Sequence, residues 1–420
     1  MKKMNKRLIA CAVTAALTIP MTAMATNGYF GHGYGTKNKG LAGGGVALAQ
    51  DAMIAATNPA GMVTVGDRLD LGAAIFSPSS RGYTVTGTPS GGGFSLANGS
   101  YESDNDFFLI PHIARNWMLD SDSSIGLTVY GNGGMNTEYA APGPFGGGVT
   151  GINLEQLFIN TTYSRKINAT SSWGASLIAV YQTFEAKGLG AFAGFSADDT
   201  KLTNNGKDTS TGFGAKFGWQ GEVTKGLTLA ASYQTEMDMS KFDKYAGLFA
   251  EQGNFDIPAT YTLGLAWDTS PKSTLTFDVQ QIMYSDIAAI SNPILPNIGA
   301  SALGNADGAG FGWEDMTVYK LGYQWDSSAD WTWRVGISQG DQPIPNSETM
   351  FNILAPAVME THLTAGFTMK TGKDGEFSLA AMYAPNNSVT GANPLDAPNT
   401  QDITIEMTQY EIEASWAWKF

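Results

Sequence analysis

TNGYFGHGYGTKNKGLAGGGVALAQDAMIAATNPAGM, residues 26–62, is the stretch that decides the fold, because it does not alternate while nearly all of the later chain does. Glycine and other small residues dominate it, and only residues 46–56 favour a short helix. The later segments alternate between apolar and polar residues, which is typical of β-strands. We therefore expect residues 26–66 to form a partly helical plug inside a β-barrel formed by residues 67–420.

The composition favours a transmembrane barrel. Charged residues make up only 15% of the chain and aromatic residues 11%, and glycine is abundant. No apolar run after residue 25 is long enough for a transmembrane helix. The net charge of −14 leaves no basic surface for nucleic acid, so a nucleic-acid partner is excluded.

The N-terminus has the three parts of a secretory signal peptide: basic residues 2–7, apolar residues 8–19 and the cleavage motif Ala23–Ala25. We expect residues 1–25 to be removed. Cys11 is the only cysteine. It lies in a poor lipoprotein-like box and is expected to leave with the signal, so the mature chain would have no disulfide.

The alternation predicts fourteen antiparallel strands. They cover residues 67–78, 105–119, 123–135, 153–168, 172–187, 209–223, 226–242, 254–269, 273–289, 313–326, 330–342, 358–371, 374–387 and 402–420. Six tight turns alternate with seven longer loops, which is typical of outer-membrane barrels with their turns in the periplasm. A barrel of this width cannot be filled by its own side chains, so it is either an open pore or plugged.

Two strands carry specific expectations about their faces. Over residues 227–239 the odd-numbered residues, including Met237 and Met239, should face lipid, whereas Glu236 and Asp238 should face the lumen. The last strand alternates from Tyr410 to Phe420. Earlier in the same strand, three apolar residues lie on the opposite phase: Ile403, Ile405 and Met407. This change of phase predicts a bulge near residues 408–409.

The signal peptide, the glycine-rich segment, the sequence Asn58–Met62 and the strand number together resemble the FadL/TodX-type outer-membrane transporters. Residues 131–135, 257–260 and 341–345 add to a resemblance that covers essentially the whole chain. It implies a monomeric barrel in the outer membrane of a Gram-negative bacterium, with an N-terminal hatch and surrounding outer-membrane lipids. It also implies passive uptake of long-chain fatty acids or other hydrocarbons. Movement of the hatch would then release the ligand through an opening in the barrel wall, at a kink in the third strand.

The end of the chain carries a second resemblance. Residues 410–420 alternate and finish with Phe420, like the C-terminal signature by which the barrel-assembly machinery recognises outer-membrane barrels. An ordinary last strand that happens to end in phenylalanine is the alternative. Trp416 and Trp418 are expected at the membrane interface.

The turn formed by Asn58, Pro59, Ala60 and Gly61 is the candidate gating element. Proline lacks an N–H group and glycine tolerates a positive φ, so we predict a sharp turn that ends a helix over Val46–Ala56. A helix stop without a gating role is the alternative.

Three glycines of the third strand, Gly131, Gly133 and Gly134, are candidates for the kink. They weaken the ladder locally, and a flexible start of the following loop is the alternative to a lateral opening.

Four residues are candidates for the ligand pocket: Tyr29, Phe30, Lys320 and Arg334. The two cations lie on the polar phase of their strands and could meet a carboxylate. Alternatively, they pair with lumen acids or the plug, and the two aromatic residues only pack against the wall.

Two loops, residues 291–303 and 350–358, are unusually apolar, which often marks a hydrophobic binding site. Their candidate capture residues are Ile294, Leu295, Ile298, Phe351, Ile353 and Leu354. The alternative is that these loops only pack over each other.

We expect no enzyme, cofactor or metal. His32, His112 and His362 lack the spacing of metal ligands. A hydrophobic small molecule is the expected ligand, either a fatty acid or, in the same fold, an aromatic hydrocarbon or alkane. An outer-membrane lipase, an open porin and an adhesin are the competing functions.

Overall fold

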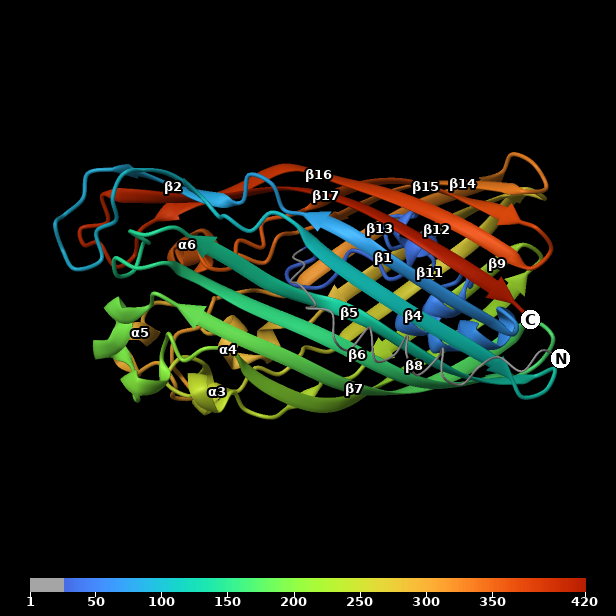
Figure 1. Cartoon of the computed structure of the whole chain (residues 1–420), viewed down its shortest axis with the longest axis horizontal. Coiled ribbons are helices and arrows are strands. Elements are labelled where there is room, and N and C mark those ends of the chain that lie inside the picture. Colours follow the sequence, from blue (N-terminus) through green and yellow to red (C-terminus); the bar gives the residue numbers. More distant parts are fainter. Residues whose placement is uncertain (1–25) are drawn as a thin grey trace.

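The computed structural model describes residues 26–420 as a closed β-barrel (Figure 1). The expected signal peptide and Cys11 lie outside these residues. The wall strands are β1 (Arg68–Ser77), β4 (Phe108–Met118), β5 (Ser123–Tyr139), β6 (Thr150–Lys166), β7 (Ser171–Lys187), β8 (Asp208–Thr224), β9 (Leu227–Gln234), β11 (Thr260–Ser270), β12 (Ser273–Ile282), β13 (Met316–Asp326), β14 (Trp331–Gly340), β15 (Thr361–Thr371), β16 (Gly375–Ala392) and β17 (Gln401–Lys419).

Antiparallel pairing between neighbours continues around the sheet, and β1 pairs with β17 from Arg68 opposite Lys419 to Ser77 opposite Tyr410. This closure satisfies the edge strands, which an open sheet in lipid could not do. Three short strands extend the sheet: β2 (Gly82–Gly87), β3 (Gly99–Glu102) and β10 (Asp238–Met239). Among residues 26–420, the other fourteen strands form the wall, so the predicted fold class is confirmed.

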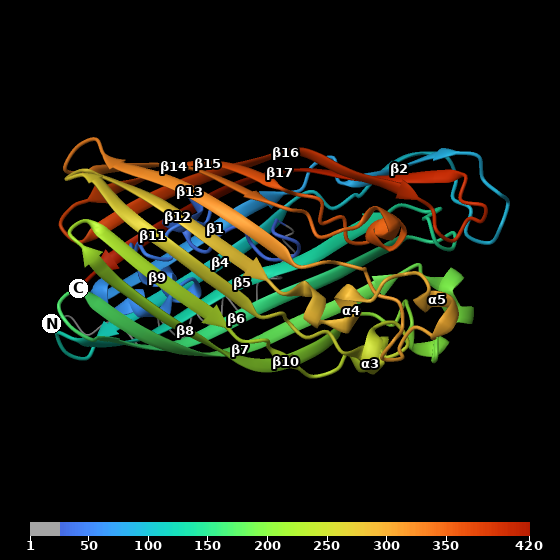
Figure 2. The ribbon, with the colours of Figure 1, turned by 180° about the vertical axis from the view of Figure 1, so that it is seen from behind.

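The two ends of the barrel differ (Figures 1 and 2). Six tight turns and the C-terminus gather at one end, here called the turn end. Seven long connections gather at the other, the loop end, and carry the short helices α3 (Ala250–Gly253), α4 (Ala288–Ser291), α5 (Asn297–Ala300) and α6 (Thr349–Asn352). No helix in the described part of the chain is long and apolar enough to cross a membrane.

The outward faces of the strands are apolar and carry two groups of exposed aromatic residues. Tryptophans lie toward the turn end, namely Trp173, Trp219, Trp267, Trp333, Trp416 and Trp418. Most exposed tyrosines lie nearer the loop end, namely Tyr181, Tyr233, Tyr261, Tyr319, Tyr383 and Tyr410, whereas Tyr323 lies toward the turn end of β13. Two aromatic belts around an apolar band are typical of membrane barrels. The interfacial position expected for the C-terminal tryptophans agrees with this arrangement.

The predicted faces of residues 227–239 are partly wrong. The alternation holds in β9, but that strand ends at Gln234 and pairing resumes in β10 with a different phase. Met237 and Met239 therefore point inward and are buried, whereas Glu236 and Asp238 are exposed. The break between β9 and β10, which the alternation alone did not reveal, reverses the faces.

The bulge predicted in the last strand is also wrong. β17 is continuous, and its odd-numbered residues face inward throughout. The irregularity lies in the partner strand, between Ala384 and Asn387 of β16. The inward face of β17 changes chemistry instead: Ile403 and Ile405 give way to Glu411 and Glu413 toward the turn end.

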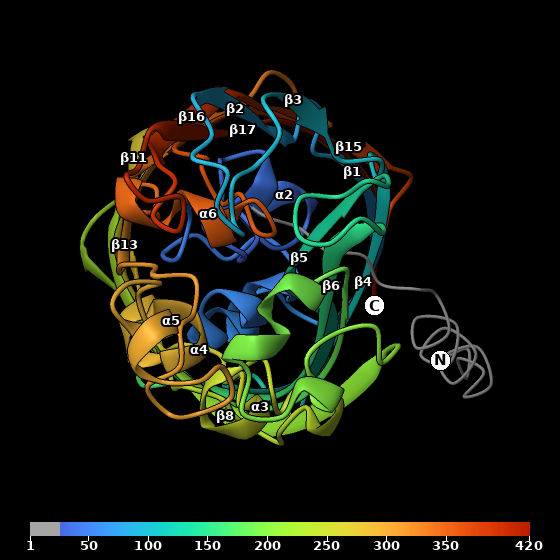
Figure 3. The same cartoon turned by 90° about the vertical axis from the view of Figure 1, so that its left-hand side faces the viewer.

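Residues 26–66 lie inside the barrel, mainly in its turn-end half (Figure 3; Figure 1, blue). This N-terminal segment contains the α-helix α2 (Thr36–Lys39) and the 3₁₀ helices η1 (Ala52–Ala56) and η2 (Pro59–Thr64). The helix predicted over residues 46–56 is wrong, because only its last five residues are helical. Asp278 of β12 accepts hydrogen bonds from Gly45 N at 2.7 Å and Val46 N at 2.8 Å. The wall therefore binds the backbone amides at the start of the predicted helix.

Candidate functional site

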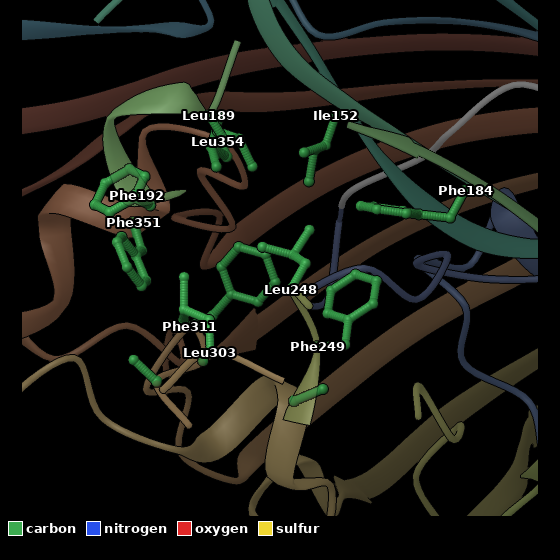
Figure 4. Close-up of a pocket in the computed structure, with 13 residues that line it drawn as sticks. Ile152, Phe184, Leu189, Phe192, Leu248, Phe249, Leu303, Phe311, Phe351 and Leu354 are labelled. Carbon is green, nitrogen blue, oxygen red and sulfur yellow. The ribbon is translucent and has the colours of Figure 1, made fainter. Parts of the chain in front are cut away.

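An apolar cavity of about 490 Å³ lies among the loops at the loop end (Figure 4). Every side chain that lines it is apolar. The lining residues are Ile152, Phe184, Leu189, Phe192, Leu248, Phe249, Ala289, Leu303, Ala309, Gly310, Phe311, Phe351 and Leu354. Its surface suits an uncharged chain or ring.

The cavity is assembled from elements far apart in the sequence. Phe184, near the end of β7, contacts Phe249 with ring centroids 4.6 Å apart. Phe192, in the connection after β7, meets Phe351 of α6 edge-on at 5.2 Å. Aromatic contacts between segments rather than backbone pairing thus join the lining.

The structure separates the six predicted capture residues. Phe351 and Leu354 line the cavity. Ile294, Ile298 and Ile353 are buried within the surrounding core, and Leu295 is 47% exposed. Sequence reasoning missed the phenylalanines at positions 184, 192, 249 and 311. Phe184 carried a signal, since it is an apolar residue on the inward phase of a wall strand.

Tyr29 and Phe30 lie between the apolar cavity and the rest of the lumen. Tyr29 is fully buried, and its ring centroid lies 6.1 Å from those of both Phe255 and Trp313. Phe255 in turn packs 4.8 Å from the cavity residue Phe249. Neither Tyr29 nor Phe30 lines the apolar cavity. These two residues form a layer between that cavity and the rest of the lumen, here called the partition.

Tyr284 fixes this partition. Its hydroxyl donates to Asn27 O at 2.6 Å and accepts from Tyr29 N at 3.1 Å. Burial raises the pKa of the Tyr284 hydroxyl well above its ordinary value, so the group stays a neutral donor.

A second, polar cavity of about 440 Å³ lies on the other side of Phe30. Lys216 and Lys320 both line it and are buried. Lys216 donates to Ala56 O, and Lys320 donates to His32 O at 3.1 Å. Neither lysine forms an ion pair with a carboxylate of the described chain. Lys320 faces the lumen, as its strand phase predicts, and two lysines border one cavity.

Arg334 also faces inward but lines neither cavity. Its Nε and Nη2 donate to Gln50 Oε1 at 3.0 and 2.6 Å, and Nη1 donates to Thr368 at 2.8 Å. Of the two alternative partners considered for Arg334, the lumen acids Glu236 and Asp238 are exposed and do not pair with it. The other partner, the N-terminal segment, is the one that Arg334 binds, through Gln50.

Buried ion pairs fix the N-terminal segment at the turn end. Lys39 pairs with Glu411 at 2.8 Å and Glu413 at 2.7 Å, and Lys37 pairs with Glu376 at 2.6 Å. Each of these side chains is at most 8% exposed. Removing one partner would leave a buried charge without compensation, so this contact resists opening.

The predicted turn at Asn58–Gly61 has a different structure. Asn58 is the N-cap of η2 and accepts a hydrogen bond from Ala60 N at 3.0 Å, with Pro59 as the first helical residue. The predicted positive φ at Gly61 is wrong. A Cβ there would lie 2.6 Å from Ile54, so glycine is needed for close packing. The turn therefore begins a 3₁₀ helix rather than only ending one.

The barrel wall has a gap beside the predicted kink. β4 pairs with β5 only from His112 opposite Tyr130 toward the turn end. Beyond this point β5 bulges at Asn132 and pairs with β6 alone, and it runs to Tyr139 rather than ending at residue 135. The predicted glycines therefore lie in the middle of the strand. Pro111 on β4, which the sequence reasoning missed, cannot donate to this ladder.

The N-terminal segment covers the gap from inside. Gly31 N donates to Asn132 O, and Gly134 N donates to Tyr29 O, both at 2.9 Å. A Cβ at Gly133 would lie 1.7 Å from Tyr29 O, so a side chain there would prevent this approach. A cavity of about 250 Å³ at the gap is lined by β4, β5 and the same segment.

The Ser338–His362 pair lacks the geometry of a hydrolase nucleophile and base. Ser338 Oγ lies 3.1 Å from His362 Nδ1, but His362 Nε2 is buried without a partner among the described residues. A serine–histidine nucleophile needs an accessible serine and a group that orients the base. Both residues are instead buried against the N-terminal segment, with His362 stacked on His32 at 5.7 Å.

These features define a class: a membrane barrel whose lumen is closed by its own N-terminal segment beneath an apolar cavity. The profile of the family described as outer membrane protein transport protein (OMPP1/FadL/TodX) matches residues 21–408, and the chain belongs to this family. The family resemblance inferred from the sequence is thereby confirmed.

Curated relatives and solved structures agree with this assignment. The long-chain fatty acid transport protein of Salmonella typhi is 23% identical over 421 residues, covering 90% of this chain and 92% of the relative. The protein of that name from Escherichia coli K12 is 24% identical over 393 residues, covering 82% and 84%.

Two crystal structures share the fold. The toluene transporter TodX of Pseudomonas putida has a TM-score of 0.67 at 18% identity, covering 93% of this chain and 99% of TodX. A FadL homologue from Pseudomonas aeruginosa has a TM-score of 0.67 at 15% identity, covering 93% and 98%.

Proposed function

We propose that this protein carries long-chain fatty acids or other hydrophobic compounds passively across the outer membrane of a Gram-negative bacterium, as a monomer and without enzymatic activity. The observation that carries the proposal is the wholly apolar cavity above a lumen closed by the N-terminal segment. Such a cavity has no donors for sugars or ions. The names of the relatives support the same ligand class. In this orientation the turn end faces the periplasm.

The proposed route has three steps. The ligand enters the apolar cavity between the loops. Displacement of Tyr29 and Phe30 then opens the partition, so the N-terminal segment acts as a hatch. The ligand leaves sideways into lipid through the gap between β4 and β5, where Gly133 lets the hatch approach the wall. Asn58–Gly61 anchor the hatch during this movement. The C-terminal strand and Phe420 serve recognition by the barrel-assembly machinery.

The choice of ligand rests on the two cavities. The apolar cavity alone suits an aromatic hydrocarbon or alkane, the alternative that the toluene transporters support. The polar cavity with Lys216 and Lys320 favours a carboxylate, because neither ammonium group forms an ion pair with a carboxylate of the described residues, and Asp278, opposite Lys320 in the ladder, acts on it only from a distance. We therefore favour fatty acids, with the chain beside Phe30 and the carboxylate toward these lysines.

Deleting residues 26–45 tests the hatch. We expect the truncated protein to assemble, as judged by heat-dependent migration on gels, but to lose most uptake of a radiolabelled fatty acid in cells without another transporter. Normal uptake would contradict a gating hatch. Large steady conductance of the intact protein in a planar bilayer would instead favour an open porin, and ester hydrolysis would favour a lipase.

Deleting Asn132 tests the gap. Removing the bulged residue restores the register of β5, so β4 and β5 can pair further and the gap closes. We expect uptake to fall while the cavity still binds ligand in detergent. The matched control deletes Asn386, in the bulge of β16, which has no gap beside it. Equal uptake by the two variants would contradict lateral release.

A further inference from the structure

Arg81, between β1 and β2, is a buried cation without a counter-ion. Its side chain donates from Nη2 to Ser103 Oγ at 2.9 Å and to Asn105 O at 2.5 Å. The Nε–H group is buried with no acceptor among residues 26–420. No carboxylate of residues 26–420 forms an ion pair with it, and Asp106 acts only from a distance. Burying a charge this way is costly unless a partner compensates it.

Arg81 lines a cavity of about 300 Å³ whose other lining is mostly apolar. Phe76 comes from β1, Met135 from β5 and Met407 from β17, and Ala355–Ala357 come from the loop after α6. The Arg81 Cζ atom also lies 5.8 Å from the ring centroid of Phe108. One cationic donor group in an apolar cavity is suited to a molecule with an anionic head and a hydrocarbon body.

This Arg81 cavity lies beside two parts of the proposed route. Leu354 lines the apolar capture cavity, and the next residue, Ala355, lines the Arg81 cavity. Thr137 of β5 donates to Leu354 O at 2.8 Å and fixes that loop beside the wall. Met135 lies just beyond the bulge of β5, and Phe108 begins β4, so the cavity borders the loop end of the gap.

We propose that Arg81 binds the carboxylate of an anionic amphiphile as it leaves through the gap. This inference rests on the proposed function and adds a substrate class to it: carboxylate-bearing chains use this site and uncharged hydrocarbons do not. The free Nε–H can donate to a carboxylate oxygen, and an arginine keeps its charge when buried more readily than a lysine does. The binding would occur at the outer end of the gap, apart from Lys216 and Lys320.

The test compares a long-chain fatty acid with the fatty alcohol of the same chain length, using uptake into cells that lack another transporter. In Arg81→Met, which keeps the apolar length, we expect fatty acid uptake to fall about tenfold. Alcohol uptake should change less than twofold. Arg81→Lys should recover only part of the fatty acid uptake. Heat-dependent gel migration verifies that each variant has assembled.

The outcomes separate the two proposals. If the wild type takes up neither compound, the proposed function fails. If the wild type takes up both and Arg81→Met leaves the acid-to-alcohol ratio unchanged, only the Arg81 site is overturned. Mass spectrometry of co-purified lipid tests whether a lipid phosphate, and not a fatty-acid carboxylate, occupies the Arg81 cavity. Loss of a phosphate-bearing lipid from Arg81→Met, with that ratio unchanged, would assign the cavity to a membrane headgroup and overturn the proposal.

Lys187→Met is the comparison, because it removes a partly exposed cation at the loop end that pairs with Glu138 at 3.2 Å and lines none of these cavities. An unchanged acid-to-alcohol ratio in Lys187→Met together with a tenfold fall in Arg81→Met assigns the selectivity to the Arg81 site. An equal fall in both variants would indicate a general effect of lost positive charge and overturn a role for Arg81.

Discussion

The two halves of the barrel interior are held by different forces. At the loop end, phenylalanine, leucine and isoleucine side chains pack around a cavity with no polar group in its lining. At the turn end, Lys37 and Lys39 of the N-terminal segment pair with buried glutamates of the wall. Apolar contacts are non-directional and tolerate a shifted neighbour, whereas buried ion pairs need fixed geometry. The loop end is therefore suited to accept ligands of varied shape, and the turn end to keep the barrel closed.

A single strand illustrates the difference. The inward face of β17 presents Ile403 and Ile405 near the loops, and Glu411 and Glu413 near the turns. The backbone is continuous between them. The division therefore arises from side-chain identity alone, and single substitutions can test each half separately.

The largest effect is expected from Lys39→Met at the turn end. This change leaves Glu411 and Glu413 buried without their shared cation, at a cost of about 3–5 kcal/mol. The N-terminal segment should leave its seat, so planar-bilayer recordings should show frequent large openings. The control is Lys419→Met, because Lys419 is half exposed and its partner Glu376 keeps two other cations. A closed Lys39→Met channel with wild-type stability would contradict the assignment of closure to this half.

A smaller effect, on ligand uptake and not on closure of the barrel, is expected from Leu354→Asp at the loop end. A carboxylate in the apolar cavity has no donor nearby, so ligand uptake should fall at least about tenfold while the barrel stays closed to ions. Leu295→Asp is the control, since this side chain is 47% exposed at a loop surface. Equal loss of uptake in both variants would indicate a general effect of charge in the loops and not of the cavity.

The wall could be predicted from the sequence because it obeys a local rule. Each strand must present an apolar face to lipid, so period-two alternation reveals the strands and their turns. The interior obeys no such rule. Phe184 comes from β7, Phe249 and Phe311 come from two different connections, and the three meet only in the folded protein. Their convergence is a long-range property that no local pattern contains.

The N-terminal segment was hardest to predict because the wall determines its conformation. Residues 46–56 have helix-forming composition, yet Asp278 and Asp70 accept hydrogen bonds from backbone amides at Val46 and Ala52. These contacts satisfy the amides without a continuous helix, so tertiary structure overrides propensity. The prediction of a turn at Asn58 located the right residues but missed the role of its side chain as a cap.

The smallest effect is expected from Asn58→Ala, which removes one anchor at the turn end without removing charge. Asn58 caps η2 and donates to Val46 O at 2.9 Å and Trp219 O at 3.3 Å. Loss of the cap costs about 1 kcal/mol, so amides of residues 46–64 should exchange about fivefold faster. Asn58→Asp keeps the acceptor and should exchange at an intermediate rate. Unchanged exchange in Asn58→Ala would mean that the ion pairs of Lys37 and Lys39 hold the segment without help from this turn.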